Sequence, residues 1–306
     1  MSEKNPQSLA GPQGRVLVTR PAVQSAELVD ALQLAGWQVQ ALPMLVVEPL
    51  PLPSLAADLR SLFVTADAAA AVPSIAIFIS ANAVQCSAGL LRTLRLAWPN
   101  HLYCCGIGAA TLAAIEAQGW PLLPLVKTGH DTQSSEGQGI EEQGIEEQSS
   151  EALLARLQAI DLARARVLLF CGQGGRNILQ RSLAERGAQV QRIETYRRLR
   201  PDYSAAAFAQ SMHSFLHRDS ARGERAAFMP VMMFASTATV ENFCFFARAS
   251  AYWQQLVELP ALLPSARVAG DAAALGLRNA VVAGNASTQA FLRALARLPH
   301  GSRCKL

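Results

Sequence analysis

An internal repeat constrains the fold of this chain more than any other feature. A strand-like run around Val16 leads into a helical pattern that ends at Gly36, and a second strand follows directly. The same pattern begins again around Val167, and its helical segment ends at Gly187. Both pairs of residues are separated by the same number of positions, and the sequence Gln-Val-Gln follows each glycine closely. The repeat predicts two copies of one strand–helix–strand unit.

Two further elements repeat in the same order. A strand that ends in serine before a helix occurs at 75–84 and again at 231–240. A strand, a short helix, a glycine and another strand occupy 102–126, with a weaker copy at 267–283. Strands that alternate with helices favour parallel sheets, and strands that are apolar along their length indicate sheets covered on both faces. We therefore expect an α/β protein with two Rossmann-like lobes and a cleft between them.

The composition excludes several classes of protein. Apolar residues make up 51% of the chain and charged residues 16%, as in a compact globular protein. The net charge is only +4, and the basic residues are scattered, so no nucleic-acid partner is expected. No apolar stretch approaches the ~20 residues of a transmembrane helix, and the polar start resembles no signal peptide. The six cysteines form no Cys-x-x-Cys pair, which predicts a cytoplasmic protein without disulfides.

A low-complexity acidic segment covers about 130–150. The sequence Gly-Ile-Glu-Glu-Gln occurs at 139–143 and is copied directly at 144–148. Such a polar, acidic run cannot bury an apolar core. We expect a surface loop inserted into one lobe.

The sequence gives little support for a metal site or a nucleotide-binding site. His213 and His217 would share one helix face, but no acidic or thiol partner follows at ligand spacing, so a surface pair is favoured over a metal site. The turn at 106–111 has Thr111 where the third glycine of a dinucleotide fingerprint belongs. No Gly-Lys-Ser/Thr occurs anywhere in the chain. The sequence therefore predicts neither a metal nor a cofactor.

The strand ends are the remaining candidates for a ligand site. Ser80 and Ser236 stand where a strand gives way to a helix, which is the position of a capping serine. Helix starts present unpaired N–H groups that can bind carboxylates. Tyr196 precedes two arginines at the point where the chain is expected to leave one lobe. It either anchors a hinge or offers its hydroxyl to a ligand in the cleft.

The ordered motifs together resemble the uroporphyrinogen-III synthase family. The matching segments are 18–21 (Val-Thr-Arg-Pro), 78–84 (Phe-Ile-Ser-Ala-Asn-Ala-Val), 106–111, the unit from 171 that ends with Tyr-Arg-Arg at 196–198, and Phe-Ala-Ser at 234–236. The resemblance implies two Rossmann-like (flavodoxin-like) lobes joined by a two-stranded β-ladder that the chain crosses twice. Lobe 1 would comprise 1–44 and 199–306, and lobe 2 would comprise 45–198.

The resemblance also implies a reaction. Enzymes of this family convert the linear tetrapyrrole hydroxymethylbilane into uroporphyrinogen III, without a cofactor, by loss of water, inversion of ring D and cyclisation. The bilane cyclises unaided to the non-inverted isomer, so the protein acts mostly by positioning its substrate. The implied partners are this small molecule and, transiently, the preceding enzyme of the pathway. We expect a monomer.

The resemblance assigns roles to particular residues. Tyr196 matches the tyrosine that would assist hydroxyl departure as a general acid. The candidate substrate-binding residues are Arg20, Ser80, Gly106, Thr111, Gly174, Arg176, Ser236 and Thr237.

One apparent departure from the family keeps alternatives open. The family usually has a Gly-Pro-Thr turn before the helix in the second copy of the third element. We expect that turn at 270–273, where this chain has Gly-Asp-Ala-Ala. Asp271 would bring a negative charge toward an anionic substrate. The chain is therefore either the synthase or a non-catalytic relative that binds a tetrapyrrole. A sugar- or nucleotide-binding transferase would need a glycine loop or an acidic residue that the sequence lacks.

Overall fold

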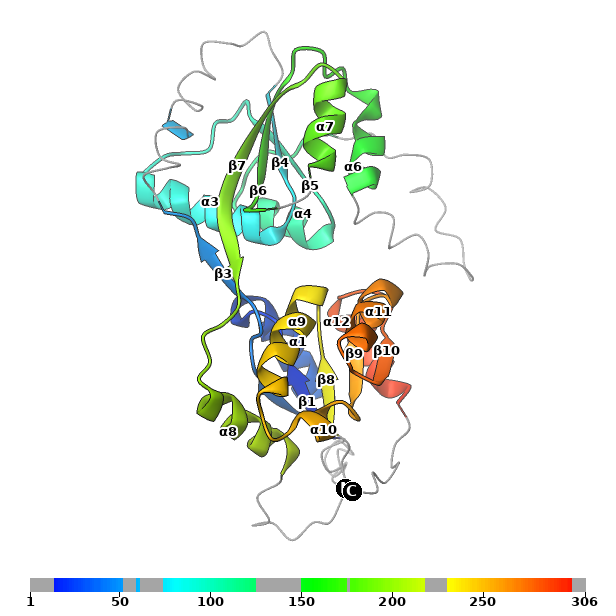
Figure 1. The fold of residues 1–306 in the computed structure, drawn as a ribbon. Helices are drawn as coiled ribbons and strands as arrows, with labels where there is room; N and C mark the ends of the chain where they lie inside the picture. The colour runs from blue at the N-terminus through cyan, green and yellow to red at the C-terminus, as the bar shows by residue number, and fades with distance from the viewer. Residues whose placement is uncertain are drawn as a thin grey trace, which may run out of the picture. The chain divides into compact units, whose positions relative to one another are not determined.

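The chain divides into two compact units. The computed structural model describes residues 14–51, 59–60, 74–124, 150–174, 177–217 and 230–298. Unit 1 comprises Met1–Val46 and Leu199–Leu306, and unit 2 comprises Val47–Arg198. Each unit contains one five-stranded sheet with helices on both faces (Figure 1). The predicted α/β class with two lobes and an interleaved chain is confirmed.

The sheet of unit 1 is parallel, with the strand order β10-β9-β8-β1-β2. Its strands are β1 (Gly14–Val18), β2 (Trp37–Ala41), β8 (Pro230–Met233), β9 (Pro260–Leu263) and β10 (Asn279–Val282). Its helices are α1 (Ala22–Leu34), α8 (Ala205–Leu216), α9 (Thr237–Arg248), α10 (Trp253–Leu256), α11 (Ala266–Ala274) and α12 (Thr288–Ala296). β1 therefore lies beside a strand that follows it by some two hundred positions.

Strand β1 shows why these strands are apolar along their length. Val16 and Val18 belong to the core cluster that contains Leu28 of α1 and Phe291 of α12. Leu17, which points to the other face, belongs to the cluster formed with α8, α9 and α11. All three strand residues are completely buried. Burying one such side chain contributes about 1.5–3 kcal/mol, so both faces of the sheet stabilise the unit.

The sheet of unit 2 has the order β3-β7-β6-β4-β5. Its strands are β3 (Val46–Pro49), β4 (Ser74–Phe78), β5 (Tyr103–Gly106), β6 (Arg166–Gly172) and β7 (Gln189–Leu199). Its helices are α3 (Ala81–Leu94), α4 (Ala109–Ala117), α6 (Ser150–Arg156), the 3₁₀ turn Leu157–Ala159 and α7 (Ile178–Glu185). β4 to β7 pair in parallel, while β3 is antiparallel to β7. The chain passes from unit to unit in β3 and at the end of β7, which is the predicted two-stranded ladder.

The last repeated element differs from the prediction. The segment 267–270, expected as a strand, lies inside helix α11, and the preceding strand is β9, Pro260–Leu263. Val268 and Ala272, four residues apart, are the buried positions of α11, which is helical spacing. Ser265 caps this helix through its side chain, which accepts from the backbone N–H of Val268. The short strand before it is apolar and fully buried but carries no alternation by which the sequence could mark it.

Two other elements have bounds that the sequence did not indicate. Strand β7 runs from Gln189 to Leu199, so Tyr196 lies within a strand. The strand expected at 120–126 is represented by a single bridge between Cys104 and Leu122, and its last two residues lie outside the described ones. The acidic segment at 130–150 also lies outside the described residues, except for Ser150 at the start of α6.

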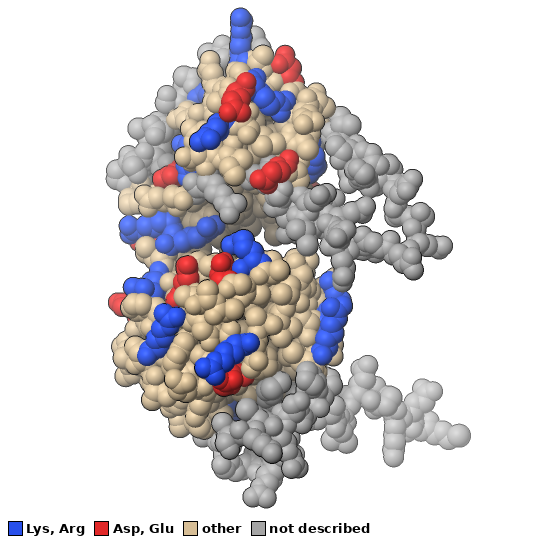
Figure 2. All heavy atoms as spheres, turned by 45° about the vertical axis from the view of Figure 1, so that its right-hand side comes forward, with Lys and Arg blue, Asp and Glu red and all other residues tan. Residues whose placement is uncertain are grey.

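Charge is distributed without strong segregation on the visible surface. In the view of Figure 2, basic and acidic side chains of the described residues are scattered among uncharged ones in each unit. This distribution agrees with the small net charge of +4. Among the described residues, no helix is long and apolar enough to cross a membrane.

Candidate functional site

Tyr196 and Ser80 meet at the carboxyl end of the sheet of unit 2. The Tyr196 hydroxyl lies 3.0 Å from Oγ of Ser80, the residue that follows β4 and caps α3. Nη2 of Arg198 donates to the same hydroxyl at 3.1 Å, and its guanidinium lies 5.6 Å from the centre of the tyrosine ring. The ring is completely buried, whereas Ser80 is half-buried. Ser80 therefore joins an enclosed phenol to the surface of this edge.

Gly172 provides the space for the tyrosine ring. A Cβ at this last residue of β6 would lie 2.7 Å from Cζ of Tyr196 and 3.1 Å from its hydroxyl oxygen. The next residue, Gln173, donates its backbone N–H to the carbonyl of Tyr196 at 2.7 Å. The end of β6 and the ring on β7 are thus fitted together, and a larger side chain at 172 would displace the phenol.

The glycine turns of unit 2 lie at the same edge. Gly106 ends β5, and a Cβ there would lie 2.7 Å from Cγ2 of Thr111, which is buried in the first turn of α4. Gly174 follows β6 with a φ of 77°, a conformation that favours glycine. Arg176, the other predicted contact in this turn, lies outside the described residues.

Arg192 holds the glycine turn after β6 and was missed by sequence reasoning. Its Nη1 donates to Oδ1 of Asn177 at 2.8 Å, and its Nη2 donates to the carbonyl of Gly172 at 3.3 Å, so it binds both ends of the turn. Its Nε lies 3.1 Å from Oε1 of Glu194 on the same strand. A basic and an acidic residue two positions apart on a strand are the only local sign of this role.

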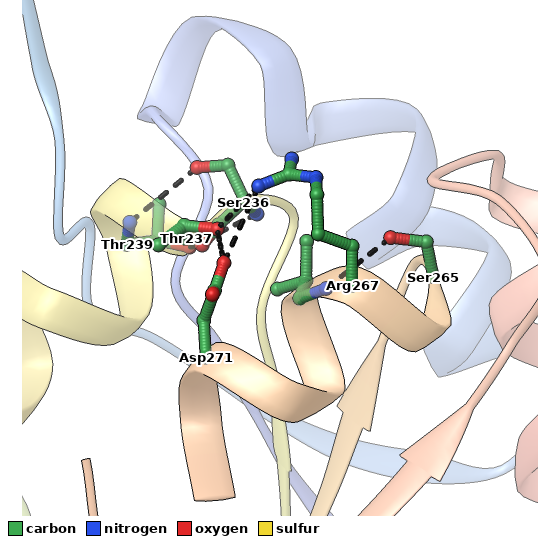
Figure 3. A network of polar contacts seen from close by, with 7 residues as sticks. Ser236, Thr237, Thr239, Ser265, Arg267 and Asp271 are labelled. Carbon is green, nitrogen blue, oxygen red and sulfur yellow. Dashed lines mark hydrogen bonds and ion pairs between the residues drawn. The ribbon is translucent and has the colours of Figure 1, made fainter. Parts of the chain in front are cut away.

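The sheet of unit 1 also has a capping serine at its carboxyl edge, but with different neighbouring residues. Ser236 follows β8 and caps α9, and it forms a capping box with Thr239. Thr237 in the first turn donates its hydroxyl to Oδ2 of Asp271 on α11 at 2.6 Å. Nη1 of Arg267 approaches that oxygen at 3.3 Å (Figure 3). The sequence placed Ser236 and Thr237 at this edge but did not indicate the two charged residues of α11 as their neighbours.

Arg20 is engaged within unit 1. Its Nη2 donates to the carbonyl of Ala286 in the loop before α12, and its guanidinium lies 5.5 Å from the ring centre of Phe291. Burial lowers the pKa of the Arg20 guanidinium from its ordinary value, while the charge of Glu27 acts in the opposite direction. These contacts fix the Thr-Arg-Pro turn against the last helix.

Neither metal ligation nor thiol chemistry finds support among the described residues. The rings of His213 and His217 are tilted by 45° with their centres 4.6 Å apart, and Nδ1 of His213 lies 3.0 Å from the Tyr252 hydroxyl. The described part of the chain contains no group of three residues that could hold a metal ion. Burial raises the pKa of the thiols of Cys171 and Cys244 to about 11, so both remain protonated near neutrality.

Comparison with known proteins identifies the family. The model of the family described as uroporphyrinogen-III synthase HemD matches residues 26–293. The chain belongs to the uroporphyrinogen-III synthase family. It is accordingly a hydro-lyase of tetrapyrrole biosynthesis.

Two named relatives support this assignment. A uroporphyrinogen-III synthase of Salmonella typhimurium is 26% identical over 281 residues, which are 92% of this chain and 99% of the relative. That of Proteus mirabilis is 28% identical over 194 residues, which are 63% of this chain and 85% of the relative.

Solved structures of this family share the fold. The Helicobacter pylori uroporphyrinogen-III synthetase has a TM-score of 0.52 at 12% identity and covers 94% of this chain and 100% of its own. A mutant uroporphyrinogen III synthase of Thermus thermophilus has a TM-score of 0.50 at 18% identity and covers 93% and 99%.

The turn that opens α11 lies earlier in the chain than the sequence indicated. Because β9 ends at Leu263 and α11 begins at Ala266, this turn is Leu263-Pro264-Ser265. Ser265 supplies the capping hydroxyl. The supposed departure at Gly270-Asp271 was therefore wrong, since both residues lie within the helix.

Proposed function

We propose that this enzyme converts hydroxymethylbilane into uroporphyrinogen III, inverting ring D before cyclisation. The observation that carries the proposal is the alignment with relatives named uroporphyrinogen-III synthase over 92% of the chain and 99% of the relative's length. The Tyr196–Ser80 contact at the edge where ligands of parallel sheets bind supports it.

The reaction begins with departure of the terminal hydroxyl of the bilane as water. Tyr196 supplies the proton, and because its ring is enclosed, the proton passes through the hydroxyl of Ser80 to the leaving oxygen. The Arg198 guanidinium, which donates to the phenol oxygen, stabilises the phenolate that remains. This step leaves the bilane as a protonated, cationic azafulvene, which is the electrophile of the next step.

The later steps require position more than acid–base chemistry. The substituted carbon of ring D attacks the azafulvene, and a spiro intermediate forms. The spiro intermediate then fragments and closes again with ring D inverted, and proton loss restores the aromatic pyrrole. Since the unaided bilane gives the other isomer, the protein must hold the conformation that favours spiro attack.

Helix starts and polar side chains would hold the substrate in this conformation. The substrate is a polycarboxylate, and the first turns of α3, α4, α9 and α11 offer backbone N–H groups at the carboxyl ends of their strands. Gly106, Thr111, Ser236 and Thr237 lie in or beside these turns, and Gly174 lies in the turn after β6. We propose that substrate carboxylates bind at the edge of each sheet, with Arg20 and Arg176 as cationic contributors.

A product-isomer assay tests the proposal. Freshly prepared hydroxymethylbilane is mixed with the enzyme, and the products are oxidised and separated as type I and type III isomers. We expect type III in excess over the uncatalysed control, and solely type I would overturn the proposal. The non-catalytic alternative loses the support of the supposed departure at Gly270-Asp271. The monomeric state, the cytoplasmic location and the contact with the preceding enzyme stay predictions.

A further inference from the structure

Arg267 occupies a position that helix stability alone does not explain. It is the second residue of α11, where the positive end of the helix dipole disfavours a cation. Its acidic partner Asp271 follows four residues later, which is the less favourable order for an ion pair on a helix. An exposed pair of this kind typically contributes little to stability. The arginine therefore concentrates positive charge at a helix start at some cost to the helix.

The side chain of Arg267 is nevertheless held in place from two helices. Nη1 lies 3.3 Å from Oδ2 of Asp271 and 3.4 Å from Oγ1 of Thr237 on α9. Thr237 in turn donates to the same carboxylate oxygen at 2.6 Å, which closes a triangle of contacts between the first turn of α9 and α11 (Figure 3). Strands β8 and β9, which lead into these helices, are neighbours in the sheet. The guanidinium is thereby fixed at the carboxyl edge of unit 1.

The exposure of the network leaves the arginine accessible to a ligand. The side chain of Arg267 is 67% exposed, and that of Asp271 is 38% exposed. Both contacts that the structure describes for this guanidinium run through Nη1. A guanidinium has five N–H donors, so further donors are available to a planar carboxylate. Ser236 and Ser265 cap the starts of α9 and α11, the two helices that hold Arg267.

We propose that Arg267 binds a carboxylate of the substrate and that Asp271 and Thr237 position its guanidinium for this contact. The inference rests on the proposed function and adds a specific anionic contact in unit 1. Asp271 acts as a positioning residue. Its negative charge, which the sequence suggested would oppose an anionic substrate, instead orients a cation.

The first test replaces Arg267 and measures KM and kcat separately. With hydroxymethylbilane, R267Q should raise KM about tenfold while kcat stays within about twofold of wild type, because a ground-state contact is lost. R267K should recover part of the affinity. R278Q is the matched control, since Arg278 precedes β10 at the opposite end of the sheet and pairs with Glu258 at 2.5 Å. An unchanged KM in R267Q, or an equal rise in R278Q, would overturn the inference.

A binding measurement separates this inference from the proposed function. Uroporphyrin III, a stable porphyrin with the product's carboxylates, is titrated against wild type and R267Q by quenching of protein fluorescence. We expect about tenfold weaker binding to R267Q at low salt and a smaller difference at high salt. If wild type formed only the type I isomer, the proposed reaction would fail. Equal porphyrin affinities of the two proteins would instead reject Arg267 as the carboxylate contact.

A double-mutant cycle tests the role of Asp271. D271N should raise KM about threefold in the wild-type background, because a less constrained guanidinium loses more freedom on binding. In the R267Q background, the same change should leave KM unchanged or lower it. If D271N raised KM equally in both backgrounds, Asp271 would not act through Arg267.

Discussion

Each of the two sheets has a capping serine at its carboxyl edge, but the residues around the two serines differ. Ser80 and Ser236 have nearly identical extended conformations, with φ values of −166° and −164°, and each caps the helix that follows its strand. The hydroxyl of Ser80 meets the phenol of Tyr196, whereas Ser236 forms a capping box with Thr239. A repeated local motif thus acquires different chemistry from the elements packed beside it.

The charged groups differ in the same way. In unit 2, Arg198 donates a hydrogen bond to the hydroxyl of the buried Tyr196. In unit 1, Arg267 is tied to Asp271 and remains exposed at the edge. We infer that the edge of unit 2 carries the acid–base step and the edge of unit 1 holds a substrate carboxylate. The following predictions test this division, beginning with the largest effect.

Replacing Tyr196 by phenylalanine should have the largest effect on turnover. The variant keeps the ring over Gly172 but removes the proton donor, so we expect kcat to fall about 100-fold with little change in KM. Initial rates of bilane consumption and urea unfolding of both proteins check the effect and the fold. A rate equal to that of wild type would remove Tyr196 from the acid role.

Alanine at the two capping serines should separate the two edges. Each loss of a cap should lower the free energy of unfolding by about 1 kcal/mol. S80A also interrupts the path from Tyr196, so its kcat should fall about tenfold. S236A should raise KM about threefold and keep its kcat, as expected for a contact in the ground state. Equal kcat values in the two variants would show that Ser80 serves only as a cap.

Alanine at Gly172 should disturb the phenol without removing it. The new Cβ would lie 2.7 Å from Cζ of Tyr196, so the ring must shift and its contact with Ser80 should be disturbed. We expect a loss of about 1–3 kcal/mol in unfolding free energy, as for other overpacked sites. Turnover should fall about fivefold, since misplacing a donor is costly even when its chemistry is intact. Normal turnover would mean that the ring position is not critical.

Replacing Gly270 by alanine should have the smallest effect. It is the glycine-to-alanine change in unit 1 that compares with Gly172→Ala in unit 2. Gly270 lies inside α11, and a Cβ there would meet no atom within 4 Å. Replacing it should stabilise the helix by about 0.5–1 kcal/mol, because glycine loses more backbone freedom on folding than alanine. Urea unfolding measures the gain, and KM should not change. A loss of stability would indicate that Gly270 is constrained by a contact beyond α11.

Features that depend on local chemistry could be predicted from the amino-acid sequence. Apolar runs before helical patterns located β1, β4, β6 and β8, because strands buried on both faces must be apolar throughout. Ser80 and Ser236 were recognised as caps because a helix start needs a side-chain acceptor within its own first turn. The ordered repeat also indicated the two lobes and, through the family resemblance, their interleaving.

Which of these groups contact one another depends on how distant segments of the chain pack together. The contact of Ser80 with Tyr196 joins β4 to β7 across β6, and the triangle of Thr237, Arg267 and Asp271 joins two helices. No periodicity records such pairs, because each residue alone looks like an ordinary cap or surface charge. The short strand Pro260–Leu263 was missed for a related reason, since its burial comes from neighbours on both faces and leaves no pattern of its own. Helix caps such as Ser80 and Ser236 can be located from local sequence, whereas the chemistry beside them depends on long-range packing.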